Sequence, residues 1–210
     1  MSPARGDRTF TVKRSFLSPL RGSERIEHSL PGAHAPGYFL GVPCGAKSER
    51  NHSVAAPTVR QIFICPAADA PMQEVREVMA LAGRGLEGDR YALGTGTYSA
   101  SPRDISRHAT LIAYDDIETA RRLGSEFHPA ETRRNIVIDG IAVADMNALV
   151  GQTFRLGAAL VKAVEICIPC ARPSLLSGKP GFQEKFDQGG GLRVEILEDG
   201  RIATGDALVR

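Results

Sequence analysis

Alternating apolar and polar positions predict a series of short strands that begins near residue 57. The signals become regular at 59–65, which Pro66 ends, and 108–113 is also predicted as a strand. The same pattern predicts strands at 73–81, 135–139, 189–197 and 201–210, and two more within 151–166 that hinge at Gly157. Because the apolar residues of such a strand lie on one face, we expect each short strand to bury that face in a core.

Helical patterning is confined to a few segments. Residues 114–123 form an amphipathic helix with Asp115 and Asp116 near its start and Gly124 as its stop. Residues 171–188 predict one or two short helices, and the Asp199-Gly200 pair predicts a tight hairpin. Many strands with few helices indicate a mainly β, barrel-like fold with a few short helices.

The first 56 residues differ from the rest of the chain. They carry 8 Lys/Arg against 4 Asp/Glu and show no helical or alternating period. We predict a disordered or poorly ordered leader at 1–56, followed by one domain at 57–210. An Arg- and Ser-rich start is also typical of a targeting segment, and a wrongly assigned start site gives the same pattern.

Composition and charge narrow the function classes. Apolar residues make up 42 % of the chain, yet no apolar run reaches the roughly 18 residues of a membrane span. The formal net charge of +2 argues against a dedicated nucleic-acid binder. Four cysteines in 210 residues are too few for a disulfide scaffold, so we expect a reducing, cytoplasmic location. We therefore expect neither nucleic acid nor a membrane as a partner.

The segment Cys167-Ile-Pro-Cys170 is the strongest local candidate for chemistry, and it allows four interpretations. A zinc site needs four ligands, and the two remaining cysteines, Cys44 and Cys65, are distant in sequence. A thioredoxin-like pair belongs at a helix start in an α/β unit, whereas these surroundings are β-rich. The other interpretations are two inert buried thiols, or one working thiolate that binds a soft metal or carries sulfur.

Three further segments offer groups that bind anions. Arg133-Arg134-Asn135 places two guanidinium groups and an amide just before a strand, where they hold a phosphate or remain solvated. The Asp89-Arg90 pair forms a structural salt bridge or presents Arg90 to a ligand. The glycines at 189–191 offer backbone N–H groups or permit a close approach of chains. His108 is interpreted as a structural residue.

The order of these motifs along the chain is more specific than any one of them. Six segments follow one another at 85–90, 132–136, 150–157, 167–172, 189–193 and 202–206. This series resembles the MOSC family, the domain named after the C-terminal part of molybdenum-cofactor sulfurase, over roughly residues 57–210. The resemblance implies a barrel-like β domain in which Cys170 is the reactive cysteine.

The resemblance also implies roles for individual residues. In this family the cysteine that matches Cys170 carries sulfur as a persulfide or ligates the molybdenum of a pterin cofactor. The residues that match Arg133 and Asn135 resemble cofactor-holding residues, Arg90 is a further candidate, and Cys167 is an accessory of unknown role. Tyr91 stands where a His is common, so no role of that His is transferred.

Three functions follow as hypotheses. The first is an oxidoreductase that binds molybdenum cofactor (molybdopterin) and acts on small N-hydroxylated compounds, with a separate electron-donor protein as partner. The second is a persulfide carrier for metal–sulfur cofactor assembly, supplied by a cysteine desulfurase, without a redox metal of its own. The third is a non-enzymatic binding module. The family is associated with pyridoxal phosphate, but this chain is too short for the desulfurase domain that binds it, so we do not expect that cofactor.

Overall fold

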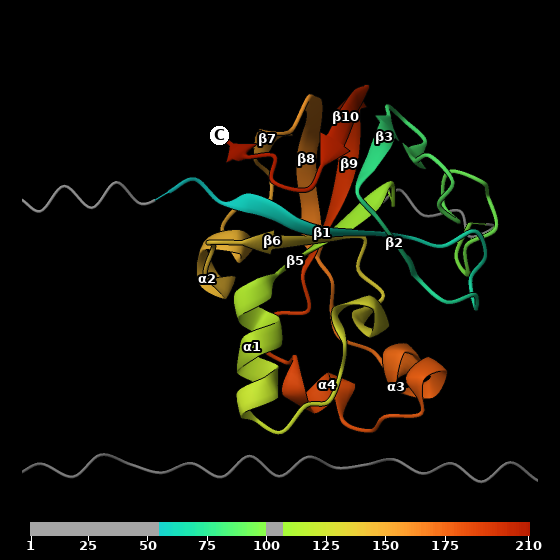
Figure 1. The fold of residues 1–210 in the computed structure, drawn as a ribbon, viewed down its shortest axis with the longest axis vertical. Coiled ribbons are helices and arrows are strands. Elements are labelled where there is room, and N and C mark those ends of the chain that lie inside the picture. Colours follow the sequence, from blue (N-terminus) through green and yellow to red (C-terminus); the bar gives the residue numbers. More distant parts are fainter. Residues whose placement is uncertain (1–54, 100–106) are drawn as a thin grey trace, which may run out of the picture. The chain divides into compact units, whose positions relative to one another are not determined.

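A computed structural model of the chain describes residues 55–99 and 107–210, and within them the strands form two sheets (Figure 1). The larger sheet contains β1 (Thr58–Ile64), β2 (Gln73–Val75), β5 (Ala109–Ala113), β6 (Ile136–Asp139), β7 (Thr153–Leu156), β8 (Ala159–Ile166), β9 (Leu192–Glu198) and β11 (Leu208–Val209). Its order is β11-β7-β8-β9-β5-β6-β1-β2, and β5 and β6 run parallel. The smaller sheet has the order β10-β3-β4 and contains β3 (Glu77–Leu81), β4 (Gly85–Leu86) and β10 (Gly200–Ala203).

The helices are short and lie mostly at one end of this unit. They are α1 (Tyr114–Arg122), α2 (Val143–Asn147), α3 (Arg172–Ser177), α4 (Phe182–Lys185) and the 3-10 turn η1 (Pro129–Thr132). In Figure 1, α1, α3 and α4 gather below β1 and β6, while β3, β8, β9 and β10 rise above them. The mainly β class is thus confirmed. None of the helices in the described ranges has the length and apolar character needed to cross a bilayer.

Most predicted elements match the structure within one or two residues. The strands predicted at 59–65, 108–113 and 135–139 are β1, β5 and β6, and the helix predicted at 114–123 is α1. The two strands hinged at Gly157 are β7 and β8, and the broken helical segment is α3 with α4. Neither α2 nor η1 was predicted from the sequence pattern. The predicted leader falls on residues outside those described.

The strand predicted at 73–81 is two strands in two different sheets. It breaks at Arg76, so that β2 pairs with β1 while β3 pairs with β10. Val75 and Val78 are three positions apart, so the alternation changes phase at the break. Only one apolar residue precedes that shift, and for this reason the sequence pattern did not reveal it.

The hairpin predicted at Asp199-Gly200 is wrong. The chain does turn there, but β9 lies between β5 and β8, so both of its edges are already paired. Strand β10 pairs with β3 in the smaller sheet instead. The turn signal therefore marks a corner at which the chain changes sheets.

The larger sheet curves until its ends nearly meet, although the named strands do not close a barrel. A single antiparallel bridge joins Thr58 to Ala207, next to β11. The Val59 N–H donates to the Asp206 carbonyl at 2.8 Å, and the Leu208 N–H donates to the Pro57 carbonyl at 2.7 Å. Strand β1 is thereby held against the last segment of the chain as well as against β6.

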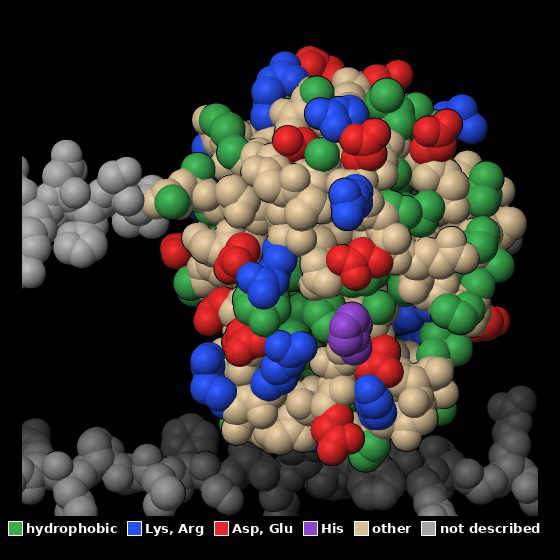
Figure 2. All heavy atoms as spheres, viewed as in Figure 1, with side chains coloured by type: hydrophobic (Ala, Val, Ile, Leu, Met, Phe, Trp, Pro, Cys, Tyr) green, Lys and Arg blue, Asp and Glu red, His purple; other side chains and the backbone are tan. Residues whose placement is uncertain are grey.

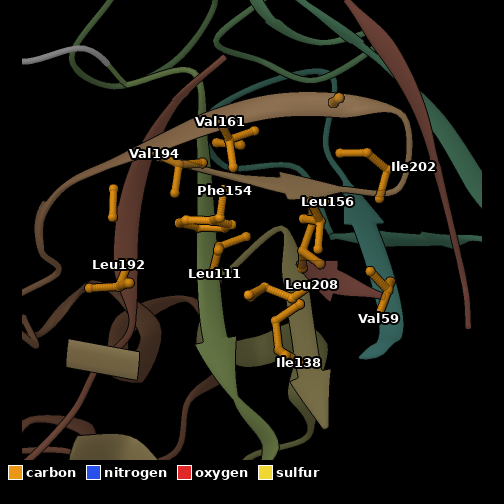
Figure 3. Close-up of a cluster of buried hydrophobic side chains, with 14 of the residues drawn as sticks. Val59, Leu111, Ile138, Phe154, Leu156, Val161, Leu192, Val194, Ile202 and Leu208 are labelled. Atoms are coloured by element: carbon orange, nitrogen blue, oxygen red, sulfur yellow. The ribbon is translucent and has the colours of Figure 1, made fainter. Parts of the chain in front are cut away.

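The main core fills the inside of this curved sheet. Figure 3 shows side chains of this core from both halves of the larger sheet and from β10 pointing toward one another, with Phe154 and Leu111 near the centre. A second cluster lies between the outer face of the sheet and the helices, where Phe127, Phe182 and Phe186 pack ring against ring. On β5, Leu111 faces the first cluster and Ile112 the second. Strands buried on both faces read as continuous apolar runs, as β5 and β6 do.

Truncating the core at the centre of the sheet should cost much of the stability. Leu111 is fully buried, so Leu111→Ala should lower the free energy of unfolding by about 2–5 kcal/mol through lost burial and a residual cavity. Leu123, which is 62 % exposed, provides the control, and Leu123→Ala should change stability by less than about 0.5 kcal/mol. Urea unfolding of both variants measures the difference, and equal losses would contradict this account of the core.

Candidate functional site

Cys170 is an exposed thiol beside a cavity of about 150 Å³. It lies in the segment between the end of β8 and the start of α3, and Cys167 at the start of that segment is buried. Both cysteines line the cavity. The other lining residues are Arg90, Tyr91, Thr97, Tyr98, Thr110, Arg133, Arg134, Ile168, Arg172, Pro173 and Arg193. The cavity thus gathers side chains from five segments that are far apart in sequence.

The sheet register brings several of these segments together. Arg193 on β9 is paired with Thr110 on β5 and with Glu165 on β8. The Cys167 N–H donates to the Gly191 carbonyl at 2.8 Å, which extends the contact between β8 and β9 past the end of the ladder. The loop that carries the cysteines therefore starts from a fixed point in the sheet.

The buried carboxylate of Asp89 organises the opposite wall of the cavity. Its Oδ2 accepts hydrogen bonds from the Cys65 N–H and the Asn135 amide, both at 3.1 Å, and from Arg90 Nη1 at 3.2 Å. Its Oδ1 accepts from the Tyr91 N–H at 3.2 Å. The Asp89-Arg90 pair forms the expected salt bridge, which is buried, and Arg90 also lines the cavity. A contact of Arg90 with a ligand stays a prediction.

Asn135 lies behind the cavity and is not among its lining residues. It is fully buried, and its amide donates to the Phe63 carbonyl and to Asp89. Its side-chain oxygen accepts from the N–H and the hydroxyl of Thr110. With donors and acceptor used inside the protein, Asn135 positions Asp89 and Thr110.

Arg133 reaches the cavity from an unusual backbone conformation. It ends η1 with φ of 63°, in the left-handed region that residues other than glycine rarely adopt. Its guanidinium group donates to the carbonyls of Ala68 and Ala70 at 2.8 and 2.6 Å. Burial lowers the pKa of Arg133, and the like charge of Arg90 lowers it further. An anion in the cavity would relieve that repulsion.

Arg134 and Asp116 hold the glycine loop against the cysteine segment. Arg134 Nε donates to the Gly190 carbonyl at 2.5 Å, and the Gly190 N–H donates to Asp116 Oδ2 at 2.8 Å. A Cβ at Gly190 would collide with the Cys167 carbonyl and lie 2.9 Å from the Pro169 ring. The glycines at 189–191 therefore permit a close approach of two chain segments, one of the two roles expected for them.

The described lining of the cavity is more positive than the face of the molecule shown in Figure 2. On the face shown in Figure 2, Lys and Arg side chains are interspersed with Asp and Glu, whereas the described lining has five arginines and no carboxylate. Arg90, Arg172 and Arg193 form ion pairs with Asp89, Asp69 and Glu165 behind or beside the lining. Arg133 and Arg134 donate to backbone carbonyls and form no ion pair within the described residues, although the Asp116 carboxyl lies near Arg134.

The structure therefore brings Cys170, Arg90 and Arg133 to one cavity and places Asn135 beneath it. Their roles in binding remain predictions. Tyr91, Tyr98 and Arg193 also line the cavity, and no local motif distinguished them as site residues. His108, interpreted as structural, accepts a hydrogen bond from the Ile196 N–H at 2.9 Å. In the described part of the chain, no group of three or more His, Cys, Asp or Glu side chains is placed to hold a metal ion.

Removing the Asn135 side chain should destabilise the fold as well as the site. Asn135→Ala would leave Asp89 and the Phe63 carbonyl short of a partner, so the free energy of unfolding should fall by roughly 2 kcal/mol or more. Asn147→Ala provides the matched control. The Asn147 side-chain amide donates one long hydrogen bond, at 3.4 Å, to the Gln188 carbonyl near the surface, so its loss should leave the free energy of unfolding almost unchanged. Denaturant unfolding tests this, and an unchanged stability in Asn135→Ala would contradict the positioning role.

Ionisation of Asp116 should make stability depend on pH. Burial raises the pKa of Asp116 to about 6, against opposing effects of the Gly190 N–H and Arg134, while Asp115 and Asp187 raise it further. A raised pKa means that the protonated form stabilises the fold below about pH 4, and that this contribution of roughly 3 kcal/mol is lost as the pH rises through about 6.

The Asp116→Asn variant removes this titration while its amide oxygen still accepts from Gly190. Between pH 4 and 7 the unfolding free energy of the wild type should therefore fall by roughly 3 kcal/mol more than that of Asp116→Asn. Asp145→Asn, in the exposed first turn of α2, should retain the wild-type profile. Parallel profiles for wild type and Asp116→Asn in urea unfolding would show that Asp116 is not the titrating group.

Comparison with known proteins gives the fold and the family. Residues 106–209 match the MOSC domain. Among solved structures, the chain is similar to the YuaD protein from Bacillus subtilis, with 14 % identity and a TM-score of 0.58 over 73 % of this chain and 94 % of that one. It is also similar to YiiM from Geobacillus stearothermophilus, with 15 % identity and a TM-score of 0.52 over 73 % and 74 % of the two chains.

At these identities the structural likeness shows the shared fold alone. No curated protein matches the sequence. The matched range begins after the Asp89-Arg90 loop and includes Arg133, Asn135 and both cysteines of the cavity. The resemblance to the MOSC family is confirmed, and the chain belongs to the MOSC domain family through residues 106–209.

Proposed function

We propose that the cavity binds an anionic cofactor of the molybdopterin class, and that Cys170 is the thiolate ligand of its metal. The observation that carries this proposal is a single exposed thiol on a cavity lined by five guanidinium groups. Guanidinium groups bind phosphate oxygens, and a soft thiolate suits a sulfur-rich metal centre.

The residues present fit such a group. Since the described residues offer no cluster of three metal-binding side chains, a metal at Cys170 must bring its other ligands with it, as a pterin cofactor does. The cavity volume of about 150 Å³ is below the roughly 300–1000 Å³ of sites that enclose a whole small ligand. A ligand of pterin size would therefore extend past the mouth of the cavity.

Each residue has a distinct task under this proposal. Arg133 and Arg134 supply the positive charge that holds the anionic end, and Asp89 fixes the direction of Arg90 toward the same space. Cys170 supplies the thiolate. The bound cofactor would supply two-electron redox chemistry, and small N-hydroxylated compounds are the substrate class that the family resemblance suggests. Electrons would come from a separate donor protein.

Metal analysis tests the proposal directly. After expression in a host that makes molybdenum cofactor, the purified chain should hold about one molybdenum per chain, and Cys170→Ser should lose most of it. Cys65→Ser is the control, because Cys65 is buried and does not line the cavity, and a serine oxygen can still accept the hydrogen bond from Arg133. This variant should leave the metal content unchanged. Equal molybdenum in wild type and Cys170→Ser would overturn the role of Cys170 as a ligand.

A second function, sulfur transfer through a persulfide on Cys170, is favoured by one further observation. A second thiol, Cys167, lines the same cavity, and a metal ligand does not need it. A carrier of this kind accepts sulfur from a cysteine desulfurase and requires an exposed thiol, as Cys170 has. Molybdenum content supports the first function, whereas a sulfur adduct on Cys170 in the absence of metal supports the second.

A further inference from the structure

Cys167 has no task in metal binding, yet its placement is well defined. It is 3 % exposed and lines the cavity with Cys170, which is exposed. Burial raises the pKa of Cys167, and the nearby Cys170 adds to that rise. Two residues separate them, in a segment with no helix or strand of its own.

The Cys167 end of this segment is held firmly. Its N–H donates to the Gly191 carbonyl, and its carbonyl and the Pro169 ring press against Gly190. Gly190 is itself fixed from the other side by Arg134 and Asp116. A fixed, buried thiol thus lies behind a thiol that solvent and a donor protein can reach.

The surroundings of Cys167 keep it from being the first thiol to react. Burial raises the pKa of Cys167, so the neutral thiol predominates, while nearby Arg134 acts in the opposite direction. An external sulfur donor reaches Cys170 first because Cys167 lies below the surface. Once Cys170 carries a second sulfur atom, Cys167 is the neighbouring thiol in the same cavity.

We propose that Cys167 is the resolving thiol, which attacks a persulfide on Cys170 and releases its outer sulfur as hydrogen sulfide. The proposal rests on the sulfur-transfer form of the function. A bond forms between Cys167 Sγ and Cys170 Sγ, and the bond from Cys170 Sγ to the outer sulfur breaks. The outer sulfur leaves with the electron pair of that bond and takes up the proton lost by Cys167. The cysteine pair is thereby oxidised to a disulfide, and an external dithiol reductant restores it.

Cys65, the other buried thiol of the described chain, does not have this placement. Its Sγ donates to the carbonyls of Ala67 and Ala70 at 2.7 and 3.1 Å and accepts from Arg133 at 3.4 Å. It is not among the residues that line the cavity. Cys65 is therefore the matched control for a buried thiol that does not line the cavity.

The test loads the metal-free protein anaerobically with a cysteine desulfurase and cysteine, removes the small molecules, and follows sulfide release and intact mass. The wild type should gain about 32 Da and then, without added thiol, release the sulfur as sulfide and finish about 2 Da below the reduced chain. Peptide mapping should place the disulfide between Cys167 and Cys170. Cys167→Ser should load equally but retain the added mass, with sulfide release slowed at least roughly tenfold until dithiothreitol is added.

The controls separate this proposal from the function on which it rests. Cys65→Ser should load and release like the wild type, and Cys170→Ser should not load. Cys167→Ala provides a second variant if serine disturbs the buried position, and thermal unfolding checks that each variant is folded. Sulfide release from Cys167→Ser at the wild-type rate would overturn the resolving role while leaving sulfur transfer intact. Failure of the wild type to load at Cys170 would overturn both.

Discussion

The hydrogen bonds of the Asp89 carboxylate are the interaction on which the rest of the site depends. A fully buried carboxylate is costly unless its oxygens are satisfied, and here four donors satisfy them. Those donors come from the end of β1, from the start of β6 and from the loop that carries Arg90. Because all of them converge on one carboxylate, the side chains that line this wall of the cavity hold a common arrangement.

The sheet gives this arrangement a rigid base. Strands β5 and β6 are covered on both faces, by the main core on one and by the phenylalanine cluster under α1 and α4 on the other. Thr110 and Asn135 immediately precede the apolar parts of these strands, so the packing of both faces fixes their positions. The cysteine segment reaches the same place from β8 through its contact with Gly191. The site thus rests on strand ends from four parts of the chain.

The sequence was sufficient for features that depend on local pattern. The pattern of apolar positions located β1, β5, β7 and β8. The Cys-x-x-Cys and Arg-Arg-Asn motifs pointed to residues that the fold brings to one cavity or directly behind it. The sequence was insufficient where the pairing of a strand depends on which of several other strands it contacts. The Asp199-Gly200 turn predicted a hairpin because the signal is local, whereas β9 pairs with β5 and β8, and β10 with β3. Asn135 and Arg133 are two residues apart, yet one is buried under Asp89 and the other faces the cavity.

The two proposed functions both require positive charge beside the Cys170 thiol. They differ in whether Cys167 is needed. Both place a negatively charged sulfur or cofactor beside Arg133 and Arg134, which form no ion pair in the described part of the chain. A metal ligand needs only Cys170, and Cys167 is then a small buried residue that many apolar side chains could replace. A sulfur carrier must also let its sulfur go, which requires two electrons from a thiol nearby. The fixed placement of Cys167 in the same cavity is therefore the feature of the described chain that separates the two functions.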